Sequence, residues 1–150
     1  MTIVAHLLKS KPDQAVHTAS PDMSVQEAMT RMADKNVGAL VVLDGDSIAG
    51  IVSERDYARK VPFKGRSAKD TLVRDIMTSR VLYVRPGQTS EECMALMTGH
   101  RLRHLPVLDK GKLVGVISIG DLVKDIIAEQ QFIIEQLEHY IMGDLVAKSH

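Results

Sequence analysis

Residues 50–56 read Gly-Ile-Val-Ser-Glu-Arg-Asp, and residues 115–121 read Gly-Val-Ile-Ser-Ile-Gly-Asp, 65 positions later. The same shift aligns the sequence before these stretches without a gap, so that Pro21 falls on Pro86. A fixed internal period of this kind indicates that one structural unit occurs twice. The chain is therefore expected to contain two copies of one fold.

Each copy has the pattern of a helix followed by a hairpin. Core-type residues recur at i, i+3, i+4 and i+7 over residues 25–32 and again over 90–97, which predicts two amphipathic helices. Ser24 and Thr89 each stand three residues before a glutamate, the pattern of a capping box. Two apolar runs around a polar turn then predict a β-hairpin in each copy. The expected fold class is α/β of the α+β type: two β-α-β-β-α repeats packed with pseudo-two-fold symmetry, plus a long C-terminal helix.

The repeat also predicts how the chain is divided. We expect a first repeat at 1–62, a linker rich in Pro, Gly and charge at 63–71, and a second repeat at 72–128. Residues 129–150 extend the last helix beyond its counterpart in the first repeat. Apolar residues on this helix approach heptad spacing, and they either fold back on their own module or pack on a partner helix. These residues are Ile119, Val123, Ile126, Ile133, Leu137 and Tyr140, interrupted by Gln130.

Composition argues against several classes of function. The 19 Lys and Arg residues balance 19 Asp and Glu residues with no basic tract, so neither nucleic acid nor a membrane surface is an expected partner. No apolar run approaches the roughly 20 residues that span a bilayer, and no signal peptide pattern is present, which favours a cytoplasmic location. Cys93 is the single cysteine, and no cluster has metal-ligand spacing, so no metal is predicted. No catalytic motif is present either, and an enzyme is not expected.

Ser53-x-x-Asp56 and Ser118-x-x-Asp121 lie where a predicted strand ends and a helix begins. Each motif is sufficient to form another capping box. The same geometry offers free backbone amides to a phosphate, and a carboxylate there can accept two hydrogen bonds from a ribose diol. The structural and the ligand-binding interpretation both remain open, and one motif can serve both roles.

Taken together, these elements resemble the cystathionine-β-synthase-type (CBS) domain over nearly the whole chain. The resemblance rests on the hairpin ALVVLDGDSIAGIV at 39–52, the ending G-h-h-S-x-x-D in both copies, and the run RLRHLPVLDKGKLVGVISIGDLV at 101–123. A tandem pair of such domains is a Bateman module. The resemblance implies a non-catalytic regulatory module that binds AMP, ADP/ATP or NAD(H) in the cleft between its repeats. Such a module transmits energy or redox state to a partner protein.

The resemblance also implies which residues contact the nucleotide. The two aspartates would hold ribose hydroxyls, the two serines would support ribose or phosphate, and the strand starts near residues 38 and 103 would recognise adenine. The segment that enters the second repeat would line the adenine pocket. The complete set is Val37, Gly38, Ala39, Ser53, Arg55, Asp56, Met77, Thr78, Leu102, Arg103, His104, Ser118 and Asp121.

The two copies differ within this set. The first repeat has Gly38 and Ala39 where the second has Arg103 and His104, so the second offers side chains suited to a phosphate. Arg55 in the first motif corresponds to a glycine in the second, which leaves room for close approach of a ligand. We expect two unequal half-sites, which hold either one dinucleotide or one occupied and one weak mononucleotide site.

A second function fits the same sequence. The apolar stripe between Ile119 and Tyr140 suits a nucleotide-independent dimerisation or adaptor module whose pockets are vestigial. A homodimer is expected on either interpretation.

Overall fold

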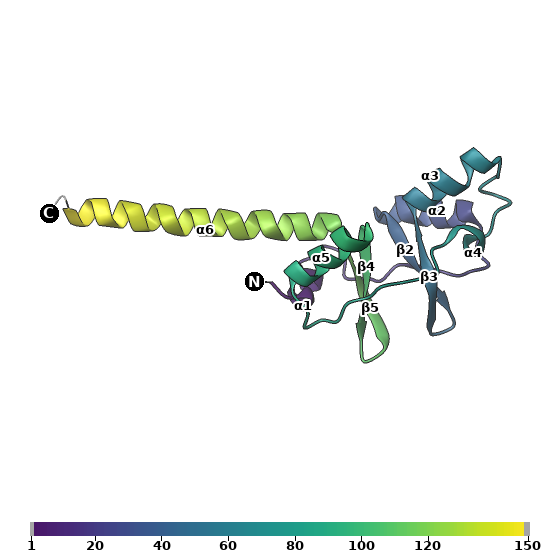
Figure 1. Ribbon diagram of the computed structural model, residues 1–150, viewed down its shortest axis with the longest axis horizontal. Helices are drawn as coiled ribbons and strands as arrows, with labels where there is room; N and C mark the ends of the chain where they lie inside the picture. Colours follow the sequence, from purple (N-terminus) through teal and green to yellow (C-terminus); the bar gives the residue numbers. More distant parts are fainter. Residues whose placement is uncertain (1, 149–150) are drawn as a thin grey trace.

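The computed structural model describes residues 2–148, which form two small modules side by side and a long helix that projects from one end (Figure 1). The structure confirms the mixed α+β class and the duplicated hairpins. In chain order the elements are α1 (Val4–Lys9), β1 (Thr18–Ala19), α2 (Val25–Lys35), β2 (Ala39–Asp44), β3 (Ser47–Ser53), α3 (Glu54–Lys60), the 3-10 helix η1 (Pro62–Lys64), α4 (Val73–Ile76), α5 (Ser90–His100), β4 (His104–Asp109), β5 (Lys112–Ser118) and α6 (Ile119–Lys148).

The two sheets keep the 65-residue register of the sequence. β2 and β3 form an antiparallel hairpin whose register shifts after Val42, and β4 and β5 form one whose register shifts after Val107. In the first sheet Ala19 of β1 pairs in parallel with Val42. In the second, Val84 pairs in parallel with Val107 as an isolated bridge. Each module is therefore built on the same strand order, although the preceding strand is reduced to one bridge in the second.

Both long helices of the repeats begin and end alike. The hydroxyl of Ser24 accepts the amide of Glu27 at 3.1 Å, and the hydroxyl of Thr89 accepts the amide of Glu92 at 3.1 Å. Asn36 follows α2 and Arg101 follows α5 as C-cap residues, both in the left-handed region with φ of 54° and 55°. Asparagine adopts this conformation readily, whereas for arginine it carries a steric cost. Arg101 therefore has a fixed and unusual backbone at the start of the second hairpin.

The two hydrophobic cores exchange their first helices. Val4 and Leu7 of α1 are buried in the core of the second repeat, together with residues of β4, β5 and α6. Val73 and Ile76 of α4 are buried in the core of the first repeat. Because a unit of about 60 residues buries too little surface by itself, this exchange joins the two repeats into one folded body. The segment that completes each core comes from the other side of the linker predicted at residues 63–71.

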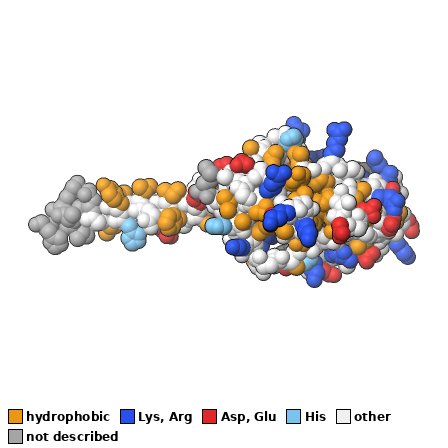
Figure 2. Space-filling model, turned by 90° about the horizontal axis from the view of Figure 1, so that it is seen from below, with side chains coloured by type: hydrophobic (Ala, Val, Ile, Leu, Met, Phe, Trp, Pro, Cys, Tyr) orange, Lys and Arg blue, Asp and Glu red, His pale blue; other side chains and the backbone are white. Residues whose placement is uncertain are grey.

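α6 leaves the module soon after it begins. Leu122 in its first turns is fully buried, but Ile127, Phe132 and Tyr140 are 60%, 61% and 76% exposed. Thirty residues of helix extend for about 45 Å. Hydrophobic side chains follow the protruding part of the helix (Figure 2). The protruding part of α6 therefore does not fold back on its own module, which was one of the two alternatives for the apolar stripe.

Within residues 2–148, no helix combines the length and the apolar character that crossing a membrane requires.

Candidate functional site

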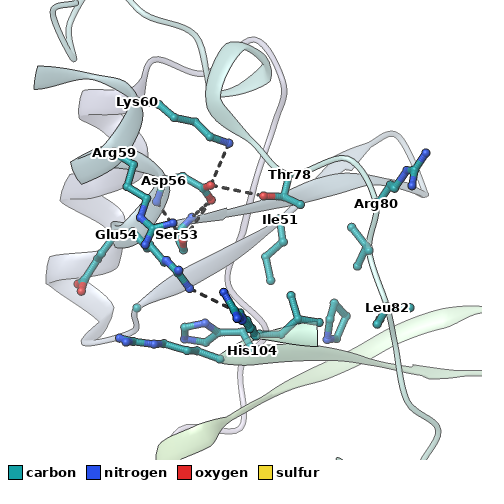
Figure 3. Close-up of a pocket in the computed structure, with 17 residues that line it drawn as sticks. Ile51, Ser53, Glu54, Asp56, Arg59, Lys60, Thr78, Arg80, Leu82 and His104 are labelled. Carbon is teal, nitrogen blue, oxygen red and sulfur yellow. Dashed lines mark hydrogen bonds and ion pairs between the residues drawn. The ribbon is translucent and has the colours of Figure 1, made fainter. Parts of the chain in front are cut away.

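A cavity of about 410 Å³ opens between the two repeats. One wall is the end of β3 and the start of α3, the second is the segment 78–82, and the third is the turn into β4 at 101–106 (Figure 3). Its volume lies in the range of small-ligand sites, which occur preferentially between packed units. Both repeats thus contribute to one cleft.

Asp56 lies at the centre of the first wall. Its Oδ2 accepts the backbone amide of Ser53 at 3.0 Å and the hydroxyl of Ser53 at 3.0 Å. The amide of Asp56 in turn donates to Ser53 Oγ, which completes a capping box. The structural interpretation of the motif is therefore correct for the first repeat. The Asp56 side chain remains 12% exposed, at the surface of the cleft.

The other oxygen of Asp56 receives two further donors. Lys60 Nζ lies 3.1 Å from Oδ1, and the hydroxyl of Thr78 donates to the same atom at 3.4 Å, as both side chains point toward the carboxylate (Figure 3). Lys60 Nζ also donates to the carbonyl of Ile76 at 2.8 Å. A carboxylate has about four acceptor positions, so a ribose diol at Asp56 would replace some of these donors.

Gly50 explains why a glycine stands three residues before the serine of the motif. Thr78 and Ile51 exchange backbone hydrogen bonds of 2.9 and 3.0 Å, which hold the segment after α4 on the edge of β3. A Cβ added to Gly50 would lie 2.6 Å from the carbonyl oxygen of Thr78. The absence of a side chain at Gly50 is what allows this segment to form one wall of the cleft.

The cleft is positively charged although the whole chain has no net charge. Six basic and two acidic side chains line it, and the Arg55 guanidinium reaches the carbonyl of Arg101 at 3.5 Å, from one repeat to the other. Charges of one sign around a low-dielectric cleft raise the local concentration of anions. The basic residues are Arg55, Arg59, Lys60, Arg80, Arg101 and Arg103, and the acidic ones are Glu54 and Asp56.

His104 lies between the two repeats. A Cβ added to Gly38 would come within 3.3 Å of His104 Nε2, so the imidazole packs against the first strand of the other hairpin. Burial lowers the pKa of His104, and the charges of Lys11 and Arg103 lower it further, while the carboxylate of Asp121 opposes them. His104 is therefore neutral near pH 7, where it offers one hydrogen-bond donor and one acceptor.

The second Ser-x-x-Asp motif repeats two of the hydrogen bonds of the first motif, those that the backbone amides donate. The amide of Ser118 donates to Asp121 Oδ2 at 2.8 Å, and the amide of Asp121 donates to Ser118 Oγ at 3.1 Å. Lys11 Nζ lies 3.1 Å from the same Oδ2 and donates to the carbonyl of Val116 at 2.8 Å. This motif lies outside the lining of the 410 Å³ cavity.

The cleft brings together most of the residues expected from the sequence. Val37 and Met77 pack instead against the first core, and Ala39 is buried in β2. Ser118 and Asp121 lie at the second motif. The expected residues that line the cleft are Gly38, Ser53, Arg55, Asp56, Thr78, Leu102, Arg103 and His104.

Sequence reasoning missed several lining residues. Arg59 and Lys60 follow Arg55 and Asp56 by one helical turn, so the i, i+4 spacing placed them on the same face and could have identified them. The segment after Thr78 carries no comparable signal, because its position depends on the backbone bridge to β3. The missed residues are Ile51, Glu54, Arg59, Lys60, Arg80, Val81, Leu82, Arg101 and Pro106.

Comparisons with known proteins identify the repeated unit. The family model of the CBS domain matches residues 6–62 and 73–128. "CBS domain-containing protein CBSX3, mitochondrial" from Arabidopsis thaliana is 38% identical over 150 residues, which cover 95% of this chain and 73% of that protein. A putative signal-transduction protein with CBS domains from Burkholderia ambifaria has a solved structure with a TM-score of 0.83 and 60% identity, over 86% of this chain and 96% of that one. The structure of CBSX2 in complex with AMP matches with a TM-score of 0.70 and 26% identity, over 85% of this chain and 98% of that one.

Proposed function

The chain belongs to the CBS-domain family, and we propose that it is a non-catalytic regulatory module that binds an adenosine nucleotide between its two repeats. One observation carries the proposal: the Ser53-x-x-Asp56 motif faces residues 101–104 of the other repeat across a basic cavity of about 410 Å³. A ligand in this cavity would contact both repeats at once. The AMP complex of CBSX2 supports an adenosine ligand as the class to test first.

The charges of the cleft suggest how the ligand is oriented. Asp56 is the carboxylate of the cleft that can accept both hydroxyls of a ribose, once Thr78 or Lys60 has moved aside. The arginines around it are suited to phosphate groups, because a guanidinium donates two parallel hydrogen bonds to phosphate oxygens. AMP, ADP, ATP and NAD(H) all combine a ribose with phosphate, and they are the effectors that we propose for this site.

Binding would be transmitted by a change in how the repeats pack. The contact from Arg55 to the carbonyl of Arg101 crosses the cleft, and a phosphate between them would compete for this guanidinium. A ligand that binds one relative arrangement of the repeats more tightly shifts the population toward it. α6 starts directly after β5, so such a shift would change the position of α6 relative to a regulated partner protein.

Calorimetric titration of the full chain with AMP, ADP, ATP, NAD⁺ and NADH tests the proposal. We expect saturable heat with at least one of them, and GMP serves as the control for base recognition. Asp44→Ala, at the exposed end of β2 in the same repeat, provides a matched control that should bind as the wild type does. A complete lack of heat with all five adenosine ligands would exclude the proposed function.

A second candidate function is a dimerisation adaptor, which the exposed stripe on α6 favours. Within this stripe Ile133, Leu137 and Tyr140 recur at helical spacing and are 50%, 57% and 76% exposed. We propose that two copies pair through this stripe into a homodimer, whether or not a nucleotide is bound. Truncation after Ala128 should then convert the protein to a monomer in light scattering, whereas truncation after Gly143 should leave the dimer intact. If light scattering gives the same oligomeric state for both truncated proteins, the stripe is not the interface.

A cytoplasmic location stays a prediction from the sequence. The Arabidopsis relative is described as mitochondrial, so the compartment needs a direct test. Fractionation of cells that express the tagged protein from its own promoter would provide one.

A further inference from the structure

The second Ser-x-x-Asp motif already holds a positive group from the same chain. Lys11 Nζ lies 3.1 Å from Asp121 Oδ2 and donates to the carbonyl of Val116 at 2.8 Å. The side chains of Lys11 and Asp121 are 27% and 20% exposed, so the pair is shielded from much of the solvent. The lysine therefore contacts one carboxylate oxygen of Asp121 and the neighbouring carbonyl of Val116.

The first repeat shows what Lys11 replaces. There the amide of Thr78 donates to the carbonyl of Ile51, and the hydroxyl of Thr78 donates to Asp56. Ile51 and Val116 are separated by the 65-residue shift, as are the two aspartates. A single ammonium group thus makes in the second repeat the two contacts that a backbone amide and a neutral hydroxyl make in the first. The first arrangement leaves a cavity beside the aspartate.

The lysine partner of Asp56 is of a different kind. Lys60 comes from the same helix as Asp56, four residues later, and its side chain is 37% exposed. Its second acceptor is the carbonyl of Ile76 in α4, whereas Lys11 binds the carbonyl of Val116, which corresponds to Ile51 at the edge of the open cleft. An exposed i, i+4 pair of this kind is weak, because solvent screens the charges. Lys11 instead reaches Val116 from 105 residues away.

A docked helix keeps Lys11 in place. Val4 of α1 is fully buried in the second core, and its amide donates to the carbonyl of Gln88 at 2.8 Å. Leu8 packs so closely on Gly115 that an added Cβ would lie 2.5 Å from its Cδ2 atom. The segment that carries Lys11 is thus part of the folded second repeat, and the ammonium group is held at the motif by packing.

We propose that Lys11 closes the second half-site, so that the module binds one nucleotide per chain, at the Asp56 motif. This inference rests on the proposed function, and it decides between the two arrangements expected for unequal half-sites. A ribose at Asp121 would have to share Oδ2 with the ammonium group, or displace that group from the carboxylate and from the carbonyl of Val116. Taking the cation away from a partly buried carboxylate leaves its charge less well compensated, which is unfavourable. Lys11 is therefore a specificity-determining residue that sets the stoichiometry of binding.

Calorimetry with ATP and AMP on the full chain measures this stoichiometry. We expect Lys11→Met to gain one binding site per chain relative to the wild type, because methionine keeps the apolar stem and removes the charge. The matched control is Lys60→Met, which removes the lysine from the other aspartate and should add no site. The double variant Lys11→Met with Asp121→Ala should lose the gained site again. Unchanged stoichiometry in Lys11→Met, with an unchanged melting temperature, would overturn the proposal.

The position of the Lys11 charge can be tested without any nucleotide. Because this charge contributes to lowering the pKa of His104, Lys11→Met should raise that pKa in an NMR titration. Lys9→Met, on the exposed side of α1, is the control and should leave it unchanged. If Lys11→Met raises the pKa of His104 but the protein binds no nucleotide, the proposed function is contradicted. The position of the Lys11 charge at the second motif is then still supported. An unchanged pKa of His104 would show that the Lys11 charge does not lie at the second half-site, and it would overturn the inference.

Discussion

The first and second repeats share a backbone but differ in what stands beside their aspartates. Asp56 faces a cavity of about 410 Å³ and pairs with a lysine of its own helix. Asp121 pairs with Lys11, which arrives from the other end of the chain. Duplication copies the hairpin and the motif, whereas the segments that precede the two copies are different. On our proposal, these flanking segments determine which copy of the motif is open to a ligand.

Replacing each aspartate in turn tests the difference between the two repeats most directly. Asp56→Ala should weaken nucleotide binding by about a hundredfold, because two hydrogen bonds to a charged group contribute roughly 3 kcal/mol together. Asp121→Ala should weaken it by less than about threefold if Lys11, which pairs with Asp121, closes the second motif as proposed. Calorimetry on both variants measures the ratio, and melting curves report the cost of the lost caps, about 1 kcal/mol each. Equal weakening by the two substitutions would show that both motifs bind the ligand.

The glycines before the motifs differ in the neighbour that a side chain would meet. In Gly50→Ala the new Cβ would lie 2.6 Å from the backbone oxygen of Thr78, which cannot move without breaking its bridge to β3. In Gly115→Ala it would meet the end of the flexible Leu8 side chain. We expect losses of about 3 kcal/mol for Gly50→Ala and about 1 kcal/mol for Gly115→Ala, the range for overpacked sites. Urea unfolding measures both, and a larger loss at Gly115 would mean that α1 packs more rigidly than α4.

His104 stands where the first repeat has Ala39, and it makes stability depend on pH. Burial holds its pKa below the value near 6.5 of the unfolded chain, so below that pH the unfolded state binds more protons. Stability is therefore lost as the pH falls through about 6.5. His104→Ala makes the two repeats alike at this position and should reduce the loss between pH 7.5 and 5.5. Melting temperatures at the two pH values test this, and an identical loss in wild type and variant would contradict it.

Cys93 is the mildest difference, because it replaces the equally buried Ala28 of the first repeat. Burial raises the pKa of the Cys93 thiol to about 11, with a further contribution from the charge of Glu92, so the reactive thiolate is scarce at neutral pH. We expect negligible labelling of the native protein by a thiol reagent at pH 8 and full labelling in urea. Cys93→Ala should cost about 1 kcal/mol, as for the removal of one buried methylene-sized group. Rapid labelling of the native protein would show that α5 opens locally.

The features that the sequence predicted are local ones. The starts of α2 and α5 follow from Ser24 and Thr89, whose hydroxyls cap the helices, and the hairpins follow from alternating apolar runs with a polar turn. The place of Asp56 in the cleft was also predictable from the sequence, because its motif lies at the end of a predictable strand. Each of these predictions depends on residues that are close together in the chain.

The rest depends on contacts between distant segments. Val4 and Leu7 match Val73 and Ile76 only at a shift of 69 residues, so the repeat at 65 gave no sign that α1 and α4 exchange cores. Lys11 carries no motif, and its role appears only once α1 is docked on the second repeat. The segment 80–82 reaches the cleft for a similar reason, since the bridge between Ile51 and Thr78 sets its course.

The direct junction between β5 and α6 gives the molecule a lever arm. α6 begins at Ile119, one residue after the serine of the second motif, and it extends for about 45 Å from this junction. A rotation of a few degrees at the junction, too small to disturb the β-sheet hydrogen bonds, would sweep the far end of the helix through several ångströms. Because the displacement grows along the helix, a spin label near Tyr140 would report such a rotation more sensitively than any probe inside the module.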